Sequence, residues 1–229
     1  MSLLKLQNVS KVYQQGQIQV QALKDIQLEV QEGEFLALVG PSGSGKTTLL
    51  NIIGGLDDSS TGSVILNNIE LTCLKESELS DFRLFQLGFI FQAYNLVPVL
   101  SALENVELVT LLQGRPAKEC RERAEHYLNL VGLKAMKDRR PSALSGGQQQ
   151  RVAVARALAA EPRLVLADEP TANLDSENAT ALLDIMHRLS HEEKTTFIFS
   201  THDQRVMERA ERIVSLRDGQ IYQDQVKGE

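Results

Sequence analysis

Residues 40–47, with the sequence Gly-Pro-Ser-Gly-Ser-Gly-Lys-Thr, carry the pattern that most directly indicates chemistry. They match GxxxxGK[ST], which forms a phosphate-binding loop when it lies between a strand and a helix. Glycines let successive backbone N–H groups turn toward an anion, and the helix that follows adds the positive end of its dipole. Lys46 offers a charge to the outer phosphates, and the Thr47 hydroxyl suits Mg²⁺. The pattern predicts a nucleoside triphosphate with Mg²⁺ as the ligand.

Two carboxylates follow the apolar run of residues 164–167. Side chains at the end of a strand point alternately to its two faces, so Asp168 and Glu169 can serve different purposes. We expect Asp168 to hold Mg²⁺, directly or through water, and Glu169 to act as a general base toward an attacking water. A lone Asp-Glu pair is more often a solvated strand end, so this interpretation depends on the phosphate-binding loop. His202 follows another apolar run, and taken alone it would be a loop or capping histidine.

A second candidate anion site is Leu144-Ser-Gly-Gly-Gln148, which precedes a helix-forming stretch from Gln149 to Ala160. Ser145 is a suitable N-cap residue. A serine and two glycines at the start of a helix can bind an anion through backbone N–H groups and the helix dipole. The sequence leaves open whether this site faces the same nucleotide, and a simple helix cap is the alternative.

Hydrophobic periodicity indicates the elements that position these residues. Alternation over residues 3–31 predicts antiparallel strands. Buried strands are expected at 35–39, 164–167 and 196–200, and helices at 46–53 and within 101–132 and 176–190. Strands that alternate with helices indicate a parallel core sheet with helices on its faces. No convincing strand falls between about residues 93 and 157, which predicts an inserted helical lobe.

Length and composition bound the class of protein. The 229 residues suffice for one large domain or two small lobes, and the formal net charge of -6 argues against a nucleic-acid coat protein. The apolar runs are strand-sized, and the N-terminus lacks the pattern of a secretory signal, so we expect a chain of the cytoplasm that does not span the bilayer. Cys73 and Cys120 are expected to be thiols.

Together these motifs resemble the ATP-binding cassette (ABC) family of ATPases from about Leu4 to Ile221. The resemblance implies an α/β fold: a P-loop NTPase core with a parallel sheet, an N-terminal antiparallel β subdomain and an inserted α-helical lobe. It further implies a single ABC ATPase domain over residues 1–229, with a RecA-like core of residues 1–92 and 158–229 and a helical lobe of about 93–157.

The resemblance also implies roles for individual residues. Gln92 matches the Q-loop glutamine, Asp175 the D-loop aspartate and His202 the switch histidine, while Tyr13 matches the aromatic residue that stacks on adenine. The implied catalytic residues are Glu169, His202 and Gln92, and the implied metal ligands are Thr47, Gln92 and Asp168. The implied nucleotide-binding residues are Tyr13, Gly40, Pro41, Ser42, Gly43, Ser44, Gly45, Lys46, Thr47, Thr48, Ser145, Gly146, Gly147 and Gln148.

Three segments, 51–57, 88–98 and 169–175, resemble the lipoprotein-release and macrolide-export group of the family, the LolD and MacB type. The resemblance implies a head-to-tail homodimer that forms on ATP binding, in which the 144–148 segment of one copy closes on the ATP of the other. It implies a separate integral membrane permease as partner, no nucleic acid, and a peripheral location on the cytoplasmic face of the inner membrane. Ala93 to Val99 is the expected permease contact, although its apolar residues could equally belong to the core of the lobe.

Two other functions compete with transport. One is a non-transport ABC ATPase that acts on nucleic acid or the ribosome, but such proteins usually carry two cassettes or a long coiled-coil insertion, which this sequence lacks. The other is a nucleotide-binding regulatory module without catalysis, against which the presence of Glu169, Gln92 and His202 argues.

Overall fold

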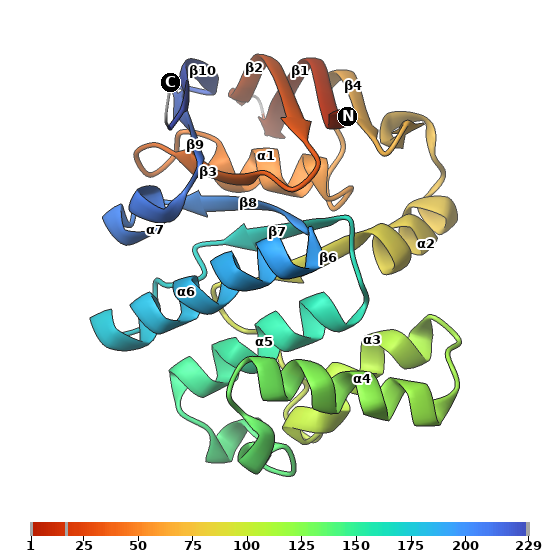
Figure 1. Cartoon of the computed structure of the whole chain (residues 1–229). Helices are drawn as coiled ribbons and strands as arrows, with labels where there is room; N and C mark the ends of the chain where they lie inside the picture. The colour runs from red at the N-terminus through yellow and green to blue at the C-terminus, as the bar shows by residue number, and fades with distance from the viewer. Residues whose placement is uncertain (1, 17, 228–229) are drawn as a thin grey trace. The chain divides into compact units, whose positions relative to one another are not determined.

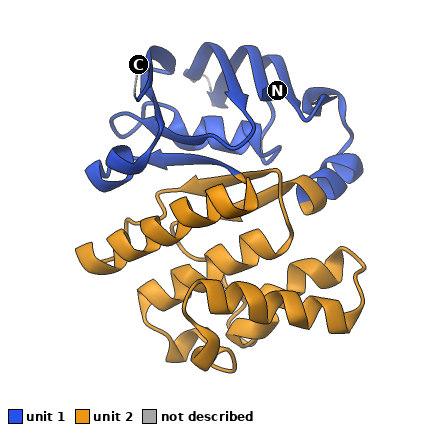
Figure 2. Ribbon diagram, viewed as in Figure 1, with its two compact units in different colours: residues 1–83, 196–229 blue, residues 84–195 orange. Residues whose placement is uncertain are grey.

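The structure is a computed structural model that describes residues 2–16 and 18–227. The chain divides into two compact units, which are coloured separately in Figure 2. Unit 1 comprises Met1–Arg83 and Thr196–Glu229, and unit 2 comprises Leu84–Thr195. Helix α2 (Glu76–Gln86) begins in unit 1 and ends in unit 2.

Unit 1 contains an antiparallel sheet with the strand order β2-β1-β4-β5. Its strands are β1 (Ser2–Gln15), β2 (Ile18–Gln31), β4 (Thr61–Leu66) and β5 (Ile69–Glu70). Leu4 pairs with Val30 and Leu6 with Leu28, and all four side chains are buried. This is the alternation that predicts antiparallel strands in this region, and that prediction is confirmed.

A second set of strands in unit 1 runs in the order β10-β9-β3-β8. These are β3 (Phe35–Val39), β8 (Thr196–Thr201), β9 (Arg212–Arg217) and β10 (Gln220–Val226). Strand β3 is parallel to both β8 and β9, and β10 pairs antiparallel with β9 (Figure 1). Phe35 packs against Phe199 with ring centroids 4.4 Å apart, so the middle of this layer is apolar.

Helices of unit 1 pack on the strands of both of these sets. Helix α1 (Lys46–Ile53) packs against β8 and β2, and α7 (Gln204–Arg209) packs against β3. A short 3-10 helix, η1 (Leu71–Cys73), follows β5. The bounds of β3 and α1 are those the sequence predicts.

Unit 2 contains two parallel strands, β6 (Leu87–Ile90) and β7 (Leu164–Asp168), and four helices. The helices are α3 (Ala102–Leu112), α4 (Ala117–Leu130), α5 (Gly146–Ala159) and α6 (Ser176–Glu193). Two 3-10 helices, η2 (Lys134–Met136) and η3 (Pro141–Ala143), lie between α4 and α5. Helices α3, α4 and α5 pack on one another, and α5 also packs on β6.

The structure adds detail to the expected helical region of residues 101–132. This region holds two helices: α3 ends at Leu112, shortly before Gly114 with its left-handed φ of 76°, and Pro116 is the N-cap of α4. The absence of a strand from 93 to 157, a range that the structure describes throughout, is confirmed.

The fold is therefore mixed α/β with one antiparallel and one largely parallel set of strands, as the sequence predicts. Over residues 2–16 and 18–227, every helix is too short or too polar to cross a bilayer.

Candidate functional site

The phosphate-binding loop connects β3 to α1 in unit 1. Gly40 has a φ of 156°, and a Cβ atom placed there would lie only 2.3 Å from the backbone oxygen of Leu216. Gly45, with a φ of 102°, is the N-cap of α1. These backbone conformations form a small turn at the start of α1, the arrangement in which backbone N–H groups face a bound anion.

Two side chains lie inside this turn. The Lys46 ammonium donates to the Gly40 oxygen at 2.8 Å and to the Pro41 oxygen at 3.1 Å, and the side chain is buried. The Ser44 hydroxyl is also buried and has no hydrogen-bond partner. Because buried polar atoms nearly always have a partner, this hydroxyl is suited to bind an anion in the turn. Pro41, Ser42, Gly43 and Thr47 are exposed around it, and Thr48 is half-buried.

Tyr13 lies on β1 and is half-buried. Its hydroxyl donates to Asp57 Oδ2 at 2.6 Å, and the ammonium of Lys11 lies 4.8 Å from the ring centroid. Burial, followed by the hydrogen bond to Asp57, raises the pKa of Tyr13, while a hydrogen bond with the Thr48 side chain lowers it. The phenol therefore stays protonated at neutral pH and is tied both to Asp57 and to the phosphate-binding helix.

Sequence reasoning missed the partners of Tyr13. Lys11 stands two residues before Tyr13, which places both side chains on one face of a strand, and this spacing was the available signal. Asp57 lies 44 residues from Tyr13 in the chain, so only the fold reveals their contact.

The histidine in unit 1 lies where β8 ends. His202 is exposed, and the residue after it caps α7: Asp203 Oδ1 accepts a hydrogen bond from the Arg205 backbone N–H at 2.9 Å. The capping role that a lone histidine could have had therefore belongs to Asp203.

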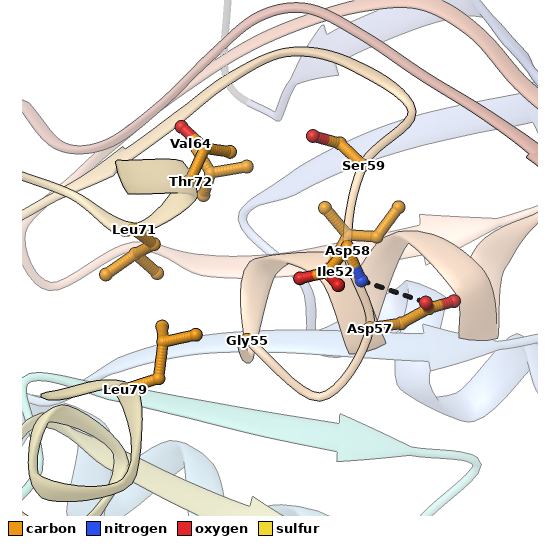
Figure 3. A pocket seen from close by; sticks show the side chains of 9 residues that line it. All are labelled: Ile52, Gly55, Asp57, Asp58, Ser59, Val64, Leu71, Thr72 and Leu79. Atoms are coloured by element: carbon orange, nitrogen blue, oxygen red, sulfur yellow. Dashed lines mark hydrogen bonds between the residues drawn. The ribbon is translucent and has the colours of Figure 1, made fainter. Parts of the chain in front are cut away.

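Unit 1 also contains a pocket of about 360 Å³ beyond the end of α1 (Figure 3). It is lined by apolar residues of α1, β4, η1 and α2 and by polar residues of the 55–59 loop, among them Asp57, Asp58 and Ser59. None of the predicted site residues lines it, so this pocket is separate from the phosphate-binding loop.

The acidic pair lies at the end of β7 in unit 2. Asp168 is the last residue of the strand, and both carboxylates are half-buried. Glu169 has a φ of 47°, in the left-handed region that costs a residue with a Cβ atom about 1 kcal/mol or more. Such conformations cluster at functional sites, which makes Glu169 the most conspicuous backbone position of this strand end.

The 145–148 segment forms the start of α5. The Ser145 hydroxyl accepts from the Gln148 backbone N–H at 3.3 Å, and Gln148 Oε1 accepts from the Ser145 N–H at 3.0 Å, which is a complete capping box. The predicted N-cap is confirmed, and the helix begins at Gly146, three residues earlier than expected.

The two glycines of this segment also have a packing reason. A Cβ atom at Gly146 would lie 2.8 Å from the Tyr94 hydroxyl, and one at Gly147 would lie 3.0 Å from Asn178 Cγ. The second glycine therefore does not by itself distinguish an anion site from a cap. Contact of this segment with a nucleotide stays a prediction.

Gln92 begins a loop whose backbone is held from several sides. The Gln92 side chain is exposed, and its backbone oxygen accepts from Asn173 Nδ2 at 2.9 Å. Tyr94 and Asn95 have φ values of 61° and 49°, and both of their carbonyls accept hydrogen bonds from the Arg156 guanidinium of α5.

One buried side-chain amide holds the backbone of the rest of this loop through hydrogen bonds. Asn105 of α3 accepts from the Val97 N–H at 2.7 Å and donates to the carbonyls of Val97, Leu100 and Ser101. Val99 is 70% exposed and Pro98 is exposed, while Leu96 and Val97 are half-buried. The loop thus presents apolar side chains on a fixed backbone.

Asp175 is the N-cap of α6. Its carboxylate accepts from the Asn178 N–H at 2.9 Å and from Asn178 Nδ2 at 2.6 Å, and these hydrogen bonds lower the pKa of Asp175. In sum, unit 1 carries Tyr13, residues 40–48 and His202, whereas unit 2 carries Gln92, residues 145–148, Asp168 and Glu169.

Comparison with known proteins identifies the family. The profile of the ABC transporter family matches residues 23–172. The chain is 43% identical over 227 residues to MJ0796 of Methanocaldococcus jannaschii, an uncharacterized ABC transporter ATP-binding protein, and covers 97% of each sequence. It is 44% identical to the lipoprotein-releasing system ATP-binding protein LolD of Idiomarina loihiensis over 98% of both chains.

A longer relative and a solved structure agree with this. The chain is 44% identical to the macrolide export ATP-binding/permease protein MacB of Brucella melitensis, but it spans only 35% of that protein's length. The dimeric structure of a post-hydrolysis state of the cassette MJ0796, bound to ADP and Pi, matches with a TM-score of 0.90 at 44% identity and covers 97% of this chain and 98% of that one. This chain therefore belongs to the ABC transporter family, as an ATPase cassette.

Proposed function

We propose that this chain is the ATP-binding and hydrolysing subunit of an ABC transporter that powers a separate inner-membrane permease, of the lipoprotein-release or macrolide-export type. The phosphate-binding loop carries this proposal: the left-handed glycines, the enclosed Lys46 ammonium and the buried, unpartnered Ser44 hydroxyl together suit a triphosphate. Family membership and relatives named LolD and MacB give the transporter class.

Different groups of the nucleotide-binding residues contact different parts of ATP. Tyr13 stacks on adenine, residues 40–48 bind the phosphates through the backbone N–H groups of every residue except Pro41, and Lys46 donates to the outer phosphate oxygens. Ser145, Gly146, Gly147 and Gln148 bind the γ-phosphate of the ATP held by a second copy.

Hydrolysis is assigned to the acidic pair and its companions. The Thr47 hydroxyl, the Gln92 amide oxygen and the Asp168 carboxylate are hard oxygen donors, the ligand type that Mg²⁺ prefers. When bound, Mg²⁺ supplies neutralisation of charge on the phosphates. Glu169 accepts the proton of the attacking water, Gln92 orients that water, and His202 stabilises the transferring phosphoryl group.

Two copies of the chain assemble because each copy supplies only part of the contacts to each ATP. A head-to-tail homodimer forms when ATP is bound, because each nucleotide needs the loop of one copy and the 145–148 segment of the other. The solved dimers of the related cassette support this arrangement. Within each copy we assign residues 1–92 and 158–229 to a RecA-like core and about 93–157 to the helical lobe.

The permease docks on the exposed apolar loop from Ala93 to Val99, whose backbone Asn105 and Arg156 hold in place. This places the chain on the cytoplasmic face of the inner membrane as a peripheral subunit. The alternative of an ABC ATPase acting on nucleic acid or the ribosome gains no support, because the matched relatives are named as transporter proteins.

The test is phosphate release by the purified chain, alone and with its permease in lipid nanodiscs. We expect slow hydrolysis alone and at least several-fold faster hydrolysis with the permease. Lys46→Ala should abolish both rates, whereas Lys118→Ala, which removes an exposed lysine of α4, should change neither. ATP binding without any phosphate release in either preparation would overturn the proposal in favour of a regulatory module.

A further inference from the structure

The carboxylate of Asp57 joins two side chains of β1 to the end of the phosphate-binding helix. Its Oδ2 accepts from the Tyr13 hydroxyl at 2.6 Å, and its Oδ1 accepts from Lys11 Nζ at 2.6 Å and from the Asp58 N–H at 2.8 Å. Figure 3 shows the last of these hydrogen bonds at the edge of the pocket. Both oxygens of the carboxylate therefore have defined partners.

Asp57 is fixed to helix α1 through the backbone. The N–H groups of Leu56 and Asp57 both donate to the Asn51 oxygen, at 2.8 and 3.3 Å. Lys46 stands at the start of this same helix, which has eight residues and is about 12 Å long. The helix thus begins with the phosphate-binding lysine, and Asp57, which follows its last turn, is hydrogen-bonded back to it.

Lys11 completes the cluster. Its ammonium bonds Asp57 and the Asp58 carbonyl, each at 2.6 Å, lies 4.8 Å from the centroid of the Tyr13 ring, and its side chain is only 12% exposed. Burial acts to raise the pKa of Asp57, but the hydrogen bonds from Lys11 and Tyr13 outweigh it and lower that pKa. The anchor is therefore charged at neutral pH.

We propose that Asp57, supported by Lys11, is a positioning residue that fixes the Tyr13 ring at a set place relative to the phosphate-binding loop and so strengthens binding of the nucleotide base. The inference rests on the proposed function, in which Tyr13 contacts the base. A ring that is already held in place loses less side-chain freedom when the base stacks on it. Asp57 itself touches no nucleotide.

The charge of Asp57 makes the proposal easy to distinguish from an electrostatic effect. ATP is an anion, so removing a nearby carboxylate should strengthen ATP binding if Coulomb repulsion were the main effect. Loss of positioning predicts the opposite sign. Asp58 is the matched control: it is the next residue, it is exposed, and only its backbone takes part in the cluster.

The experiment is calorimetric titration of the full-length chain with ATP and with inorganic tripolyphosphate, which has the phosphates but no base. Asp57→Ala should raise the Kd for ATP about threefold to tenfold, the order expected for one side chain that must be immobilised on binding. The Kd for tripolyphosphate should stay unchanged or fall. Asp58→Ala should leave ATP binding unchanged or slightly tighter.

A second variant protects the test from a misfolded Asp57→Ala protein. Tyr13→Phe keeps the ring and removes only the hydroxyl, which bonds both Asp57 and the Thr48 side chain, so it should weaken ATP binding by a similar or larger factor and leave tripolyphosphate unaffected. Both substitutions break the same Tyr13–Asp57 hydrogen bond. The double variant should therefore lose little more ATP affinity than either single variant.

Three results would overturn the inference: ATP affinity in both variants equal to that of the Asp58→Ala control, equal losses for ATP and tripolyphosphate, or fully additive losses in the double variant. Equal losses would show that the cluster merely supports helix α1. A parent chain that binds neither ligand would instead contradict the proposed function itself.

Discussion

At the scale of single residues, Glu169 and Lys46 illustrate what a motif can and cannot predict. The loop pattern locates Lys46 because each of its positions has a local reason, such as the left-handed Gly40. The pattern does not predict that Glu169 adopts a φ of 47°, since this conformation depends on how the chain turns after β7. Lys11 and Asp57 escaped sequence analysis because their contact spans 46 residues.

The first prediction concerns the general base. Glu169→Gln keeps the size of the side chain and removes the carboxylate that, by our proposal, accepts a proton from water, so ATP turnover should fall by about a hundredfold or more, the usual contribution of general base catalysis. ATP binding should persist. Single-turnover hydrolysis measures the effect, and Glu192→Gln, an exposed glutamate of α6, serves as the control. Unchanged turnover in Glu169→Gln would exclude it as the base.

At the scale of elements, buried runs and caps are predictable, and polar edge strands are not. The bounds of β3 and α1 follow from an apolar run and a glycine-rich turn, and the Ser145 cap follows from its residue type. Strand β10, with the sequence QIYQDQV, is exposed over nearly its whole length, so it has no hydrophobic alternation to reveal it. Its register comes from pairing with β9.

The second prediction separates capping from phosphate binding at Ser145. Aspartate is as good an N-cap as serine, so Ser145→Asp should keep α5 and change the free energy of unfolding by less than about 0.5 kcal/mol. If the segment faces a γ-phosphate, the added negative charge should abolish ATP-driven dimerisation. Urea unfolding and light scattering measure the two effects. A variant that still dimerises with ATP would support the cap alone.

The third prediction concerns the loop from Ala93 to Val99. Asn105→Ala leaves the Val97 N–H and several carbonyls without their partner, so the free energy of unfolding should fall by about 1–3 kcal/mol. Hydrolysis by the chain alone should persist because Asn105 belongs to neither of the two segments that we propose bind phosphate, but stimulation by the permease should be lost.

Chemical denaturation and permease-stimulated phosphate release test this, with Asn129→Ala, an exposed asparagine of α4, as control. Full stimulation in the Asn105→Ala variant would argue that docking occurs elsewhere.

At the scale of the whole molecule, the sequence accounts for the fold class and the family, while the site residues themselves stay predictions. Regular strand and helix signals and a strongly patterned loop suffice for an α/β cassette. The residues assigned to one ATP lie in two compact units of the chain and, by our proposal, in two copies of it. No local pattern can specify such a shared site, because its parts meet only through tertiary and quaternary structure.

The fourth prediction is the oligomeric state. The chain should be a monomer without nucleotide, and Glu169→Gln with ATP should double the molar mass in multi-angle light scattering. Adding Lys46→Ala to this variant should keep it monomeric, since the phosphates then lack the ammonium group of Lys46. A stable dimer in buffer without nucleotide would contradict the proposal that ATP drives assembly.

The left-handed backbone of Glu169 has a consequence for engineering this chain. Glycine would relieve that strain of roughly 1 kcal/mol, and the greater freedom of glycine in the unfolded chain would offset much of this gain. A laboratory screen for heat resistance alone would therefore tolerate glycine at this position and let through chains that lack the proposed general base. Selection for thermal stability should therefore keep Glu169 unchanged, or measure ATP turnover as well as resistance to heat.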